Sequence, residues 1–71
     1  MRTQAKLIQV TGDQEDFTDV IGHNGELYVS KSPWFKANGD VISMLSRRIT
    51  REDGLIKIST KLGNTFTFRV L

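Results

Sequence analysis

Residues 55–71 read LIKISTKLGNTFTFRVL, with apolar and polar residues alternating in two runs. A period of two is typical of strands that bury one face, so this stretch predicts a β-hairpin. If residues 62–64 form a three-residue loop, Ile58 lies opposite Phe68 and the apolar side chains share one face. We therefore expect an antiparallel hairpin that packs its apolar face on the core.

The second face of this hairpin is basic. In the same register Lys57 lies directly opposite Arg69, and Lys61 follows along the same side. Like charges opposed across two strands are mildly destabilising. A neighbouring carboxylate or an anionic partner would relieve this repulsion, and an ordinary solvated surface is the alternative interpretation.

Length and composition predict one small intracellular domain, residues 1–71. The chain has no cysteine, which excludes disulfides and favours a reducing, cytoplasmic setting. The N-terminus has no apolar run typical of a signal peptide or a membrane span. Residues 1–35 hold three cations and five acids, for a net charge of −2, whereas residues 36–71 hold seven cations and three acids, for +4. This asymmetry indicates an oriented charged partner or attraction between the two halves.

The N-terminal half of the chain predicts three further strands. Residues 5–11 alternate and end at a glycine, which predicts the first strand. Residues 17–22 and 26–31 flank Asn24-Gly25, a strong hairpin signal, and Pro33 follows them. We expect a second hairpin there.

Residues 40–54 fit two interpretations. As a helix of about residues 41–52, the segment has Asp40 as N-cap and gathers its apolar residues on one side. As a strand that follows a turn at Asn38-Gly39, it fails the alternation, because Ile42 would share a face with Arg48. The helix is the preferred interpretation.

The expected element order is therefore β-β-β-α-β-β, an α+β fold. This order is found in OB-folds, and it predicts a small five-stranded antiparallel sheet or partly closed barrel with one helix. If residues 40–49 form a strand instead, an SH3-like all-β barrel becomes the better description. No stretch of the chain carries a motif specific enough to indicate a family.

Catalysis and cofactor binding find little support. His23, the only histidine, falls at the predicted Asn24-Gly25 turn, where a positioned partner and a pocket are not expected. The acidic segment that starts at Asp13 does not match a calcium-binding loop, because its fifth position is Phe17. No phosphate-binding glycine motif occurs. We expect a protein that is not an enzyme and that has no cofactor or metal site.

Binding is the better-supported function, and nucleic acid is the leading candidate partner. The predicted helix and hairpin would supply cations for phosphates, and three aromatic residues could stack on bases. The candidate residues are Arg47, Arg48, Arg51, Lys57, Lys61, Arg69, Tyr28, Trp34 and Phe35. At least one ring of Trp34-Phe35 is expected in the core of so small a domain. The alternative function is a regulator or inhibitor that docks on an acidic surface of a larger protein; the oligomeric state stays open.

Overall fold

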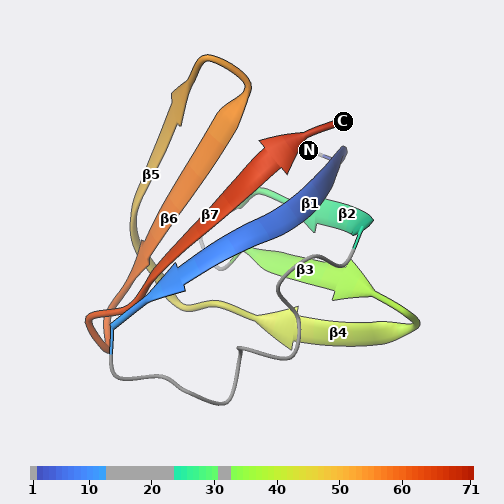
Figure 1. Ribbon diagram of the computed structural model, residues 1–71. Helices are drawn as coiled ribbons and strands as arrows, with labels where there is room; N and C mark the ends of the chain where they lie inside the picture. The colour runs from blue at the N-terminus through green and yellow to red at the C-terminus, as the bar shows by residue number, and fades with distance from the viewer. Residues whose placement is uncertain (1, 13–23, 31–32) are drawn as a thin grey trace.

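The computed structural model describes residues 2–12, 24–30 and 33–71 (Figure 1). The regular elements of these residues are β1 (Arg2–Thr11), β2 (Asn24–Tyr28), β3 (Trp34–Ala37), β4 (Asp40–Ser43), β5 (Ser46–Glu52), β6 (Leu55–Thr60) and β7 (Thr65–Val70). They pair in one antiparallel sheet of order β4-β3-β2-β1-β7-β6-β5. The described residues contain no helix, and hence none that is long and apolar enough to cross a membrane.

The predicted α+β class is wrong, because the segment expected to be a helix forms β4 and β5. The OB-like order with a helix is excluded with it, and the SH3-like all-β alternative fits better. Two Asx-Gly pairs decide this outcome. Asn38 and Gly39 have φ angles of 53° and 83°, and Asp53 and Gly54 have 49° and 76°. Two consecutive residues with positive φ make the tight two-residue turn that joins antiparallel strands.

A bend and a β-bulge explain why the alternation of residues 40–52 fails. β4 and β5 are joined by two residues, of which Met44 is buried in the core. The pairing of β5 with β6 then shifts between Ser46 and Arg48, which inserts one extra residue. Ile49, rather than Arg48, therefore lies opposite the buried Ile58. A bulge changes which residues face the core, and a strict period of two cannot detect it.

The first predicted strand is confirmed and begins earlier, at Arg2. β1 pairs with β2 through its first half and with β7 through its second half, with a bulge between Leu7 and Gln9. The predicted turn at Asn24-Gly25 is wrong, because both residues lie inside β2 and pair with β1. The proposed partner strand, residues 17–22, lies outside the described residues.

The C-terminal hairpin is confirmed, but its register differs by two residues. Asn64 joins the ladder, since its carbonyl accepts a hydrogen bond of 2.8 Å from the Thr60 amide, so residues 61–63 form the three-residue loop. Ile58 consequently lies opposite Phe66, and Lys57 opposite Thr67. A shift of two preserves the faces, so the predicted apolar side is correct. The predicted opposition of Lys57 and Arg69 is wrong.

The sheet curls into a barrel-like shape around one core. Strands β5, β6 and β7 form one side, β2, β3 and β4 form the other, and β1 extends along both (Figure 1). The rings of Phe35 on β3 and Phe68 on β7 lie 4.9 Å apart between centroids, although two strands separate β3 from β7 in the sheet. Such a contact requires curvature, and it places these two rings at the centre of the core.

Candidate functional site

A row of three stacked groups lies on the outer face of β1, β2 and β3. Arg2, Tyr28 and Trp34 occupy directly paired positions on these strands. The Tyr28 and Trp34 ring centroids are 3.7 Å apart with planes 13° from parallel, and the Arg2 guanidinium carbon lies 5.1 Å from the Tyr28 centroid. We call Arg2, Tyr28 and Trp34 the stacked ladder. Both rings are partly exposed, so the ladder belongs to the surface rather than to the core.

Glu26 holds the middle of the stacked ladder in place. The Tyr28 hydroxyl donates a hydrogen bond to Glu26 Oε2, and Gln4 Nε2 donates one of 3.3 Å to Glu26 Oε1. The hydrogen bond to Glu26 raises the pKa of Tyr28, with a smaller contribution from desolvation, whereas the nearby Arg2 charge opposes the shift. Tyr28 is therefore neutral and fixed in orientation at ordinary pH.

Four cations form a diagonal line across the same outer face. Lys6 on β1 lies directly opposite Arg69 on β7. Lys57 on β6 is a diagonal neighbour of Arg69, because its partner Thr67 precedes Arg69 by two residues on β7. Arg48 on β5 is in turn a diagonal neighbour of Lys57, because its partner Ser59 follows Lys57 by two residues on β6. Diagonal neighbours on one face of a sheet are about 7–8 Å apart. We call Arg48, Lys57, Arg69 and Lys6 the basic track.

The basic track leads toward the stacked ladder. Lys6, Gln4 and Arg2 alternate along β1 on the outer face, so the track ends two outward positions from the ladder. Lys36, next to Trp34 on the outer face of β3, lies opposite Glu26. One continuous surface therefore offers four cations at one end, with Glu52 beside Lys57, and aromatic rings next to Glu26 at the other.

The structure separates the remaining predicted cations from this surface. Arg47 falls in the bulge of β5, and Arg51 is paired with the buried Ile56, which places it on the inner side of that strand. Lys61 lies in the loop after β6. β5 is an edge of the sheet formed by the described residues, and charged side chains on an edge strand discourage unwanted strand pairing. The position of Arg47 and Arg51 on an edge strand thus accounts for their charges without a ligand.

The aromatic candidates divide between surface and core. Phe35 is 1% exposed and packs on Phe68, so its ring does not reach the surface, as expected for one ring of the Trp34-Phe35 pair. Trp34 and Tyr28 lie on the outer face together. His23 lies outside the described residues.

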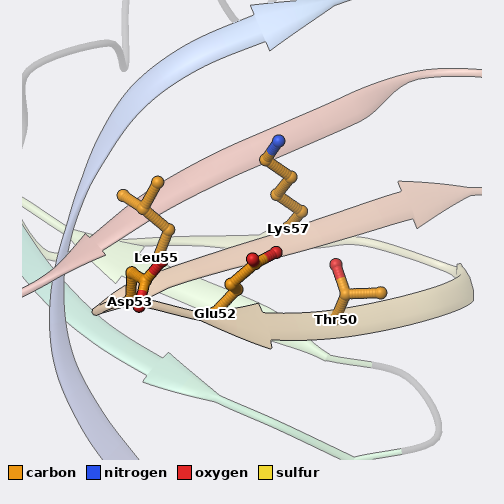
Figure 2. A pocket seen from close by; sticks show the side chains of 5 residues that line it. All are labelled: Thr50, Glu52, Asp53, Leu55 and Lys57. Atoms are coloured by element: carbon orange, nitrogen blue, oxygen red, sulfur yellow. The ribbon is translucent and has the colours of Figure 1, made fainter.

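A small pocket opens beside the Asp53-Gly54 turn (Figure 2). Its volume is about 100 Å³, and the lining residues are Thr50, Glu52, Asp53, Leu55 and Lys57. Two carboxylates and one amine give it mixed charge, which favours neither a cation nor an anion. Among the described residues no group of three metal-ligating side chains occurs, and no buried side-chain polar atom lacks a partner. The pocket therefore supports no specific chemistry.

Comparison with known proteins identifies no relative. No family model, no curated protein and no solved structure matches this chain. The fold defines only a class, a small all-β domain with a curled, barrel-like sheet.

Five residues of this surface were not among the candidate residues predicted from the sequence: Arg2, Gln4, Lys6, Glu26 and Lys36. Lys6 carried a usable signal, since it alternates with the buried Ala5 and Leu7 and so had to point outward. The proximity of Arg2 to Tyr28 had no such signal, because it depends on the pairing of β1 with β2.

Proposed function

We propose that this chain is a non-catalytic nucleic-acid-binding domain that uses the outer face of its sheet. The observation that carries the proposal is the continuity of the basic track with the stacked ladder. A line of cations suits a phosphate backbone, and exposed aromatic faces suit bases. Neither feature alone distinguishes binding from an ordinary surface, but together they match the two halves of a nucleotide.

The repulsion between the opposed cations Lys6 and Arg69 favours the binding of an anion to the basic track. Two like charges directly opposite each other across β1 and β7 repel. A phosphate between them would remove that repulsion and gain two charge-assisted hydrogen bonds. The sequence predicts such a pair at Lys57 and Arg69, whereas in the structure Lys6 is the cation opposite Arg69.

The alternative function, docking on an acidic protein surface, is favoured by a different observation. Leu45 and Leu62 are 56% and 76% exposed, and the Lys61 amide donates a 3.0 Å hydrogen bond to the Leu45 carbonyl, which brings the two segments together. Exposed apolar residues beside a cation are typical of a protein-docking surface. Leu62, in the loop after β6, belongs neither to the stacked ladder nor to the basic track, so a Leu62 variant distinguishes the two functions.

Salt-dependent binding of oligonucleotides tests the proposal. Four neutralised phosphates predict a log–log slope of affinity against salt of about −3 for a single strand. The double variant Lys6→Gln/Arg69→Gln should reduce this slope by about 1.4. Arg47→Gln/Arg51→Gln is the matched control, since it also removes two exposed cations, both outside the basic track. Absence of saturable binding, or equal slopes for the two variants, would contradict the proposal, and loss of a protein partner by Leu62→Ser would favour docking.

A further inference from the structure

The stacked ladder ends one position short of the sheet edge. Trp34 is paired with Tyr28 on one side and with Ser43 of β4 on the other. Tyr28 covers the face of the indole that points toward β2, so the opposite face points toward β4. Ser43 carries a side chain too short to cover an indole, and it is exposed. Among the residues that the structure describes, the ladder therefore has an open place above Ser43.

We propose that this open place is a subsite for one unpaired base, and hence that the ligand is single-stranded. The inference rests on the proposed function and adds to it the form of the ligand and a residue that determines specificity. A base stacked on Trp34 would add one further flat group to the stacked ladder of Arg2, Tyr28 and Trp34. The existing ring separation of 3.7 Å is already that of stacked planes.

The surroundings of Ser43 leave room for such a base. β4 is an edge of the sheet within the described part of the chain, and its outward residues are Val41 and Ser43. Val41 is 60% exposed and offers an apolar contact to the base or the sugar. The Ser43 hydroxyl can donate or accept a hydrogen bond at a base edge. The subsite thus combines one aromatic wall, one apolar neighbour and one adaptable polar group.

A base inside a duplex cannot occupy this subsite. Inside a duplex each base is covered on both faces by its neighbours, so it cannot lie on Trp34 without leaving the stack. Proteins that stack bases on aromatic side chains accordingly bind unpaired segments. The basic track alone would accept either form, because phosphate contacts carry no such requirement.

Ser43→Phe tests the subsite by filling it with a protein ring. Affinity for a single-stranded thymidine homopolymer should fall by about 5- to 140-fold, the contribution of one stacked base. Affinity for a duplex should not change, because no cation is altered. Thr11→Phe is the matched control: it places the same ring at an exposed outward position near the far end of β1.

A measurement on the unaltered protein tests the subsite even if Ser43→Phe has a folding defect. An oligonucleotide with abasic sites should bind more weakly than the homopolymer of equal length, by a similar factor. Equal affinity for abasic and normal strands, for single strand and duplex, or for Ser43→Phe and the unaltered protein would each overturn the subsite. Failure of every oligonucleotide to bind would instead overturn the proposed function itself.

Discussion

Tyr28 and Trp34 lie directly opposite each other on β2 and β3, and their rings stack at 3.7 Å. They are the only tyrosine and the only tryptophan of the chain. Tryptophan fluorescence and tyrosine titration therefore report on the same few ångströms of surface. This coincidence makes the proposed interface accessible to simple spectroscopy, without a label.

Glu26→Gln should lower the pKa of Tyr28 toward its ordinary value of about 10. The hydrogen bond to the Glu26 carboxylate is the largest cause of the raised pKa, and an amide is a weaker acceptor. Since the raised pKa belongs to the folded state, this contact stabilises the fold below about pH 10, and its contribution is lost as the pH rises through the folded-state pKa. Tyrosinate absorbance measures the shift; an unchanged titration curve would contradict the hydrogen bond, and Gln4→Ala is the control.

Gly25→Ala should destabilise the protein more than Gly39→Ala. A Cβ atom at Gly25 would lie 1.8 Å from the Lys36 carbonyl oxygen, so β2 and β3 would have to separate. At Gly39 a Cβ meets nothing within 4 Å, and only its positive φ of 83° opposes substitution, at about 1–2 kcal/mol. Urea unfolding measures both free energies. The reverse ranking would contradict the close approach of β2 to β3 at Gly25.

Ile58→Ala should lower the free energy of unfolding by about 2–5 kcal/mol, because Ile58 is fully buried between β5 and β7. Lys57→Ala, the neighbouring outward position, should change it by less than about 0.5 kcal/mol. The pair tests which face of β6 is buried. Similar losses in the two variants, measured by thermal or chemical unfolding, would show that the face assignment is wrong.

Arg69→Gln should stabilise the protein at low ionic strength by about 0.2–1 kcal/mol, since it removes the repulsion with Lys6. The gain should shrink as salt screens the unaltered pair. Unfolding curves at low and high salt measure this difference. A gain that does not depend on salt would mean that packing, rather than charge, causes it; Arg51→Gln provides the comparison.

The sequence alone specified much of the local structure. Alternation identified the first strand and the inner and outer faces of the C-terminal hairpin. The turns were also encoded locally, since Asn38-Gly39 and Asp53-Gly54 are residue pairs that accept positive φ. The similar pair Asn24-Gly25 was misleading, because Gly25 is required for close packing inside β2 rather than for a turn.

The candidate site depended on contacts that no local pattern contains. The sequence identified Tyr28, Trp34 and Arg69 as surface candidates, but their neighbours follow from the pairing of β1 with both β2 and β7. The helix prediction failed for the same reason. The two-residue connection between β4 and β5, and the bulge in β5, break the period of two where the chain passes from one edge of the curled sheet to the other. Side-chain alternation is a property of one strand's backbone and is readable from sequence. Register, bulges and strand order are decided by packing between distant segments, so only the tertiary structure placed the cations beside the stacked rings.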